Sequence, residues 1–121
     1  MKVCITAVSN SLEAQVDPRF GRCPYLIIVD LETIQFEAIV NESQDATSGA
    51  GIQASQLIVN KGAKVLLTGN IGPNAFQALS AAGVEIITGV SGTVRGVLEQ
   101  FKRGELRKTD APTVNGHSKM V

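Results

Sequence analysis

The chain contains few of the residues that most often carry catalysis or hold aromatic-cage ligands. Its 121 residues include no tryptophan, one histidine and two cysteines, and aromatic residues make up only 4%. The lack of these residues excludes many aromatic-cage sites and most catalytic designs based on histidine. Two cysteines cannot form a disulfide framework, so we expect a reduced, cytoplasmic setting.

The chain also lacks a surplus of charge and a long apolar run. Eleven Lys and Arg residues balance eleven Asp and Glu residues. Nucleic acid is therefore not expected as the main partner, because neutralising phosphates needs a basic surplus. No apolar stretch approaches the roughly 20 residues of a membrane span, and the N-terminus does not resemble a signal peptide. We expect one globular domain that binds neither nucleic acid nor a membrane.

The apolar residues are spaced to give five strands and three helices. Strand-like runs occur at 3–8, 25–29, 34–40, 64–69 and 84–88, and helical periodicity at 50–58, 75–82 and 94–101. The first three strands should form an antiparallel meander, whereas the last two follow helices and should run parallel to the first. The predicted fold is an α/β three-layer sandwich of the ribonuclease-H-like type. Its five-stranded mixed sheet has the order 3-2-1-4-5, with helices on both faces.

One domain is expected over residues 1–104, because Gly104 ends the last predicted helix. Residues 105–121 are mostly polar and predict a loosely ordered C-terminal tail. In this topology four strands end at one edge of the sheet. The loops that follow them should cluster there together with three helix N-termini, and open α/β sheets bind ligands at such an edge.

The first candidate binding motif lies in the loop after the first strand and reads Arg19-Phe20-Gly21-Arg22-Cys23-Pro24. Its two arginines could hold an anion, its glycine allows close approach, and its cysteine could offer a thiolate to a soft metal. The arginines should favour that thiolate by lowering the pKa of Cys23. Alternatively, the arginines pair with Asp17 and other acids while Cys23 is a small buried apolar residue. Cys4, in the middle of a strand, is expected in the core.

Three glycine loops precede the predicted helices. Gly49-Ala50-Gly51-Ile52-Gln53-Ala54 fits the dinucleotide pattern GxGxxA, but no acid follows about twenty residues later to hold a ribose. Gly69-Asn70-Ile71-Gly72-Pro73-Asn74 and Gly89-Val90-Ser91-Gly92-Thr93, with Ser91 as a cap, also place backbone amides at helix starts. Each loop alone is explained by ordinary turn chemistry. Together they predict an anion pocket that includes Gly49, Gly51, Gly69, Asn70, Gly72, Asn74 and Gly92.

A catalytic constellation is not apparent. A ribonuclease-H-type nuclease needs carboxylates on its central strand, and the first strand has none. An enzyme with Cys23 as nucleophile would need His117 as its base, and this histidine lies in the tail. If the tail folds back over the edge, His117 could instead be a soft metal ligand beside Cys23.

These motifs together resemble the dinitrogenase iron–molybdenum cofactor biosynthesis family, which includes NifX-like proteins and the C-terminal domains of NifB-type proteins. The resemblance is carried by residues 19–25, 49–54 and 68–76 and covers nearly the whole chain. It is closest to small stand-alone members and implies the ribonuclease-H-like fold. It also implies that the arginine and glycine loops quoted above form the binding edge.

The resemblance further implies a non-enzymatic carrier or chaperone. Its cargo would be an iron–sulfur or iron–molybdenum cluster, a cofactor precursor or a related molybdenum-containing cluster. Its partners would be metal–sulfur cluster donor and acceptor proteins, and we expect a monomer or a weak dimer. The alternative function is a module that binds a small organic anion or nucleotide without metal.

Overall fold

The computed structural model describes residues 1–46 and 49–114. The five strands are β1 (Lys2–Ala7), β2 (Tyr25–Asp30), β3 (Gln35–Val40), β4 (Ala63–Leu67) and β5 (Glu85–Ile87). The three helices are α1 (Ala50–Asn60), α2 (Pro73–Ala81) and α3 (Val94–Lys102). The strands form one sheet in the order β3-β2-β1-β4-β5, which confirms the predicted strand order and architecture. Within these described ranges, no helix has the length and apolar character needed to cross a membrane.

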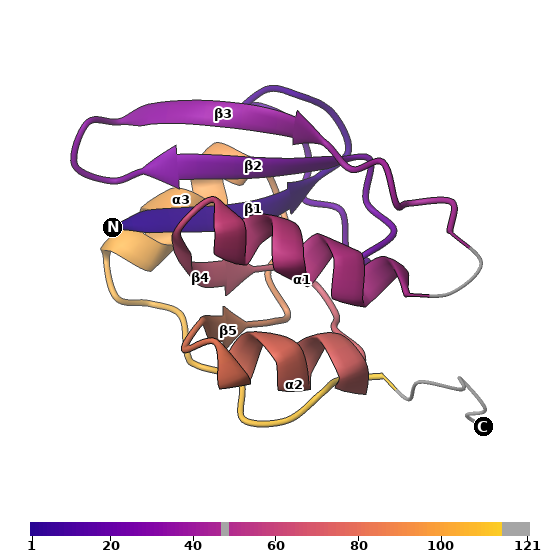
Figure 1. The fold of residues 1–121 in the computed structure, drawn as a ribbon. Helices are drawn as coiled ribbons and strands as arrows, with labels where there is room; N and C mark the ends of the chain where they lie inside the picture. The colour runs from indigo at the N-terminus through magenta and orange to yellow at the C-terminus, as the bar shows by residue number, and fades with distance from the viewer. Residues whose placement is uncertain (47–48, 115–121) are drawn as a thin grey trace.

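The direction of the strands determines where the loops gather. β1 pairs antiparallel with β2 and parallel with β4, while β3 continues the antiparallel half and β5 the parallel half. The carboxyl ends of β1, β3, β4 and β5 therefore lie at one edge of the sheet (Figure 1). The N-termini of α1 and α2 lie at the same edge, as the sequence predicts.

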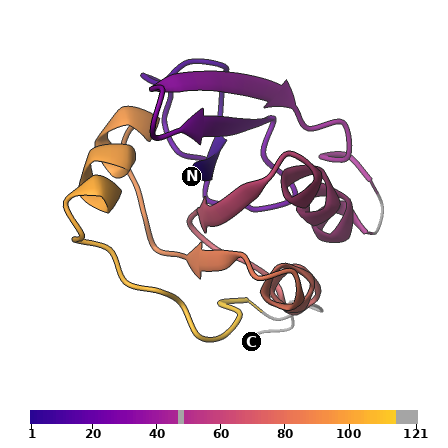
Figure 2. The same cartoon turned by 60° about the vertical axis from the view of Figure 1, so that its left-hand side comes forward.

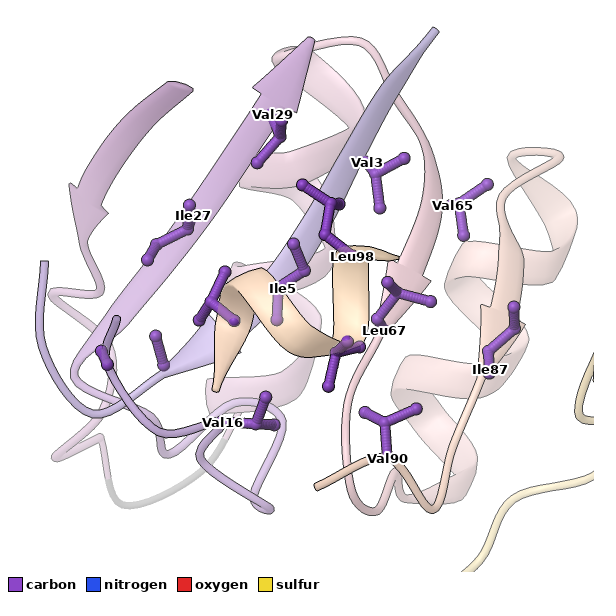
Figure 3. Packing of buried hydrophobic residues seen from close by; sticks show 14 residues of the cluster. Val3, Ile5, Val16, Ile27, Val29, Val65, Leu67, Ile87, Val90 and Leu98 are labelled. Carbon is purple, nitrogen blue, oxygen red and sulfur yellow. The ribbon is translucent and has the colours of Figure 1, made fainter. Parts of the chain in front are cut away.

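The sheet separates two apolar clusters, because successive side chains of a strand point to opposite faces. On one face Leu98 of α3 lies over Val3 and Ile5 of the central strand (Figure 3), in a cluster that also contains Val97. On the other face α1 and α2 cover a second cluster, which contains Cys4, Leu26, Ile58, Leu66 and Leu79. Figure 2 shows α3 on one side of the sheet and the other two helices opposite. Each fully buried aliphatic side chain contributes about 1.5–3 kcal/mol to this packing.

β3 is the edge strand of the antiparallel half, and its side chains are the least buried of the sheet. Phe36 and Val40 are 43% and 53% exposed and no residue of the strand is buried, so the alternation of apolar and polar residues over 34–40 does not separate a buried face from an exposed one. The strand begins one residue later than predicted. Ile34 lies in the preceding turn with a left-handed φ of 63°, a conformation that β-branched residues rarely adopt.

The described part of the C-terminal tail, residues 105–114, contacts the free edge of β5 at Thr109. The amide of Thr109 donates to the carbonyl of Ile86 at 2.7 Å. The amide of Thr88 donates to Oγ1 of Thr109 at 2.9 Å. The segment then continues from α3 towards the start of α2 (Figure 2). An edge strand covered in this way has fewer unpaired backbone groups.

Candidate functional site

Residues from four segments line a pocket of about 270 Å³ at the carboxyl edge of the sheet, which we call the helix-end pocket. Its lining comprises Phe20, Arg22, Gly49, Gly51, Ile52, Gly72, Pro73, Asn74, Ala75 and Val114. The structure therefore brings together the predicted residues Phe20, Arg22, Gly49, Gly51, Gly72 and Asn74. Sequence reasoning missed Ile52, Pro73 and Ala75, although all three belong to the motifs it singled out. It also missed Val114, which lies far from those motifs in the chain.

The first turns of α1 and α2 give this pocket its electrostatic character. Both helices start at a glycine, Gly49 and Gly72, and among the described residues no side chain caps either start. Neither first turn contains an acid. The first amides of a helix have no carbonyl partner within it and carry the positive end of its dipole. Two such helix ends beside one pocket make it suitable for an anion.

The third helix differs from the other two at its start. Oγ1 of Thr93 accepts a hydrogen bond from the amide of Gly96 at 3.0 Å, so Thr93 is the N-cap and the expected Ser91 is not. The carbonyl of Gly92 accepts from the amide of Val16 at 2.8 Å. Gly92 therefore ties the start of α3 to the loop after β1. It lies outside the pocket lining.

Close packing at three small residues holds together the two helix ends and the loop of residues 19–24, which we call the arginine loop. A Cβ on Gly21 would lie 3.0 Å from both Cα and the backbone N of Gly51. A Cβ on Gly51 would in turn lie 3.2 Å from Cβ of Ala75 in α2. Gly21 also has a φ of 96°, which favours glycine. Gly21 thus sets the position of the loop behind the pocket.

Arg22 lies at the pocket and is also tied to the loop that follows β3. Its Nη1 donates to the carbonyl of Gln44 at 2.9 Å and to that of Ala46. Both hydrogen bonds use Nη1, so the N–H groups of Nε and Nη2 take no part in them. Arg22 can therefore anchor the loop and still offer positive charge to a ligand.

Asn41 is a site residue that the sequence analysis did not identify. Its buried Nδ2 donates to the carbonyls of Gly21 and Cys23 at 3.0 and 2.8 Å. Its Oδ1 accepts from Oγ of Ser43 at 2.7 Å. An asparagine directly after a strand is a weak signal for such a role, because it is equally typical of an ordinary turn. Asn41 connects the end of β3 to the arginine loop.

Arg19 is directed to the acid two residues before it. Its Nε and Nη2 donate to the Asp17 carboxylate at 3.1 and 3.0 Å, and its backbone amide donates to the same group at 2.9 Å. These hydrogen bonds and the charge of Asp17 raise the pKa of Arg19. Asp17 itself is buried. For Arg19, the sequence alternative of pairing with Asp17 is therefore confirmed.

Gly69 and Asn70 support the arginine loop and lie outside the pocket lining. A Cβ on Gly69 would lie 2.6 Å from Cα of Pro18, so only glycine fits there. The amide of Asn70 donates to the carbonyl of Pro18 at 2.8 Å, and its carbonyl accepts from the amide of Phe20 at 3.3 Å. This short backbone pairing keeps Phe20 beside the pocket.

Cys23 is fully buried in the apolar cluster beneath α1 and α2. Burial raises the pKa of its thiol to about 12, and the nearby Asp17 carboxylate acts in the same direction. The expectation that the arginines lower this pKa is wrong, because burial dominates and Arg19 is paired with Asp17. Cys4 is buried in the same cluster, as expected, and both cysteines are free thiols.

His117, the predicted metal ligand beside Cys23, lies outside the described residues. Within residues 1–46 and 49–114, no group of three or more His, Cys, Asp or Glu side chains could hold a metal ion. The chemistry available at the helix-end pocket is therefore anion binding by backbone amides and Arg22. Metal–protein bonds from Cys23 and His117 remain a prediction of the sequence analysis.

Comparison with known proteins gives a consistent set of relatives. The family described as dinitrogenase iron-molybdenum cofactor matches residues 1–104. The apo form of the orange protein from Desulfovibrio gigas is 39% identical, covers 93% of this chain and 95% of its own, and superposes with a TM-score of 0.90. A protein assigned as NifB from Thermotoga is 37% identical, with 88% and 91% coverage and a TM-score of 0.79. An uncharacterised protein from Methanocaldococcus jannaschii is 28% identical over 111 residues, which are 89% of this chain and 91% of that protein.

Proposed function

The chain belongs to the dinitrogenase iron–molybdenum cofactor family, and we propose that it is a non-enzymatic carrier of a metal–sulfur cluster or cluster precursor. The proposed cargo is an iron–sulfur or iron–molybdenum species, held in the helix-end pocket. The observation that carries the proposal is the convergence of two uncapped helix N-termini and Arg22 on one pocket.

The lining of the pocket suits a sulfide-rich anion. Backbone amides at the starts of α1 and α2 can donate to sulfide, and the guanidinium of Arg22 can balance negative charge. Phe20, Ile52 and Pro73 supply apolar walls. Sulfide is large and weakly hydrated compared with the oxygen of an oxyanion, so contact with such walls costs little desolvation.

Weak covalent attachment favours a carrier over a resident-cofactor protein. The buried thiol of Cys23, with its pKa near 12, is protonated at neutral pH. A thiol must lose its proton to bind a metal. We therefore propose that amides and Arg22 hold the cargo first, with Cys23 and His117 as secondary ligand candidates. A cluster held in this way can be transferred intact to an acceptor.

The proposal places the protein between cluster donor and acceptor proteins, in the cytoplasm. The family description, which names the iron–molybdenum cofactor, supports a place in the metabolism of such clusters. The second candidate function is the binding of a small organic anion or nucleotide without metal. The same uncapped amides favour it, since they recognise charge and not metal.

The deciding experiment uses anaerobically purified protein and two variants with the same change of charge. Visible absorbance, metal content and affinity are measured with iron–sulfur species and with tetrathiomolybdate. Asn74→Asp adds a negative charge at the first turn of α2, in the pocket. Asn60→Asp adds the same charge at the far end of α1.

We expect stoichiometric uptake by the unmodified protein, at least tenfold weaker binding by Asn74→Asp, and unchanged binding by Asn60→Asp. An acid at a helix start stabilises the helix by about 0.3–1 kcal/mol, so weaker binding by Asn74→Asp cannot be attributed to unfolding. No uptake of any metal–sulfur species, together with a thermal shift from nucleotides or organic anions, would favour the second function.

A further inference from the structure

We propose that residues 105–114, the C-terminal strap, are part of the cargo site, and that the contact between Thr113 and Ile71 determines how fast the cargo leaves. The inference rests on the proposed function, because it concerns the same pocket. The strap follows the residues that the family comparison matches, which end at 104. None of the motifs that resemble the family includes it.

Within residues 106–114, hydrogen bonds join the strap to the domain at two places, and most of these residues are exposed. The first is the free edge of β5, where Oγ1 of Thr109 lies 2.7 Å from Oγ1 of Thr88. Leu106 packs against the cluster on the α3 face. The strap then crosses to the N-terminal end of α2 (Figures 1 and 2).

The second attachment is made by Thr113 and fixes the loop that presents α2. The amide of Thr113 donates to the carbonyl of Ile71 at 2.9 Å. The amide of Ile71 donates to Oγ1 of Thr113 at 2.8 Å. Ile71 is buried and directly precedes Gly72, the N-cap of α2. The strap therefore holds the backbone next to one of the two helix starts that form the pocket.

The next residue of the strap contributes directly to the pocket. The amide of Val114 also donates to the carbonyl of Ile71, at 3.2 Å, and its side chain is half exposed. A Cβ placed on Gly72 would lie 3.8 Å from Cγ2 of Val114. Val114 lines the pocket together with Pro73 and Asn74. It is the wall that the strap supplies.

This wall is held less firmly than the rest of the site. Residues 110–114 are exposed and are joined to the domain by the hydrogen bonds to Ile71. A segment with few buried contacts opens locally without unfolding the sheet. Opening the strap would remove Val114 from the pocket and free the backbone of Ile71. A carrier needs such a movement, because it must retain its cargo in transit and release it on delivery.

The first test compares two isosteric changes in the full-length chain. Thr113→Val removes the hydroxyl that accepts from Ile71, and Thr33→Val removes a hydroxyl that accepts from Gln35 in the turn between β2 and β3. Each protein is loaded with tetrathiomolybdate, and the release rate after rapid dilution is followed by visible absorbance. We expect release from Thr113→Val to be about three- to tenfold faster, the effect of losing one to two net hydrogen bonds. Thr33→Val should release at the unmodified rate, and the association rates should be similar in all three.

The second test places charge on the wall itself. Val114→Asp puts a carboxylate in the pocket, whereas Val59→Asp puts one on an exposed part of α1 outside it. We expect at least tenfold weaker tetrathiomolybdate binding for Val114→Asp only, with an unchanged unfolding midpoint for Val114→Asp and a fall for Thr113→Val no larger than its lost hydrogen bonds account for. In the unmodified protein, bound tetrathiomolybdate should slow hydrogen exchange at the amides of Ile71 and Thr113.

The outcomes separate this inference from the proposed function. Tetrathiomolybdate that binds the unmodified protein and leaves Thr113→Val and Thr33→Val at equal rates overturns the role of the strap and leaves the carrier intact. Equal affinities of Val114→Asp and Val59→Asp overturn it as well. If the unmodified protein takes up neither tetrathiomolybdate nor an iron–sulfur species, the proposed function fails and the inference fails with it.

Discussion

Gly21 and Gly51 meet backbone to backbone, at a separation that leaves almost no room for a side chain. A Cβ on Gly21 would lie 3.0 Å from both Cα and N of Gly51. The contact joins the arginine loop to the first turn of α1, on which the helix-end pocket depends. The two glycines thus serve the site by allowing close approach, and Gly51 also contributes to the lining.

Replacing Gly21 by alanine should therefore lower the free energy of unfolding more than the same change at another glycine with a left-handed φ. Gly83 has a φ of 81° and nothing within 4 Å of its Cβ position, whereas Gly21 has a φ of 96° and the contact with Gly51. We expect Gly83→Ala to lower the free energy of unfolding by about 1 kcal/mol, from backbone conformation alone. Gly21→Ala should lose about 1–3 kcal/mol more, because the loop must move. Equal losses in urea denaturation would show that the contact is unimportant.

The pairing of Arg19 with Asp17 leads to a second prediction. Arg19→Ala removes two donors from a buried carboxylate and leaves it the backbone amide of residue 19. We expect the free energy of unfolding to fall by about 1–3 kcal/mol, the usual cost for hydrogen bonds to a charged group. Adding Asp17→Asn should recover part of the loss, because the unpaired charge is then removed.

A double-mutant cycle by chemical denaturation measures this coupling. Additive losses would mean that the two side chains act independently. Cargo affinity measured on the same variants under folding conditions shows separately whether Arg19 also contacts the ligand. The structure assigns Arg19 a stabilising role, so we expect the affinity to change less than it does on Asn74→Asp.

The buried thiol of Cys23 makes stability depend on pH in the alkaline range. Its pKa is about 12 in the folded protein, against about 8.5 in an unfolded chain. Between these values the unfolded chain has lost the thiol proton while the folded protein retains it. The free energy of unfolding should therefore fall as the pH rises above about 8.5, by up to about 1.4 kcal/mol per pH unit for one thiol. Below that pH the thiol is protonated in both states, and its contribution to the free energy of unfolding is fully present.

Urea unfolding under reducing conditions at several values between pH 8 and pH 10.5 tests this dependence. Cys23→Ala should show a shallower fall than the unmodified protein, while Cys4, whose pKa is also raised by burial, keeps its share in both. All other ionisable groups are common to the two proteins. Identical slopes would mean that the folded protein ionises Cys23 freely, and would restore it as a ready thiolate ligand.

The fold could be predicted because local and long-range signals agree. Apolar runs predicted the strands, and helical spacing predicted the helices. The kind of connection between strands, turn or helix, predicted the strand order. The meeting of the glycine loops at one edge followed from that order, and Gly49, Gly51, Gly72 and Asn74 are indeed brought together. These features depend on residues close in sequence or on the handedness of crossovers.

The remaining features of the site depend on contacts that sequence spacing does not encode. Whether Arg19 faces a ligand or Asp17, and whether Cys23 is exposed or buried, is decided by how one loop folds onto the apolar cluster. The contribution of Val114 requires the strap to cross from α3 to α2. A polar segment after the last predicted helix contains no periodic pattern from which this path could be inferred.

The turn before β3 offers a test of strain that is independent of the site. Ile34 has a left-handed φ of 63° and is largely exposed, so its side chain gains little from packing while its backbone is strained. Asparagine tolerates this conformation better than a β-branched residue. We expect Ile34→Asn to raise the free energy of unfolding by about 1 kcal/mol, and Ile34→Val, which keeps the branched Cβ, to leave it nearly unchanged. Urea denaturation of the three proteins measures the difference, and a loss of stability in Ile34→Asn would show that Ile34 is held by contacts worth more than its strain.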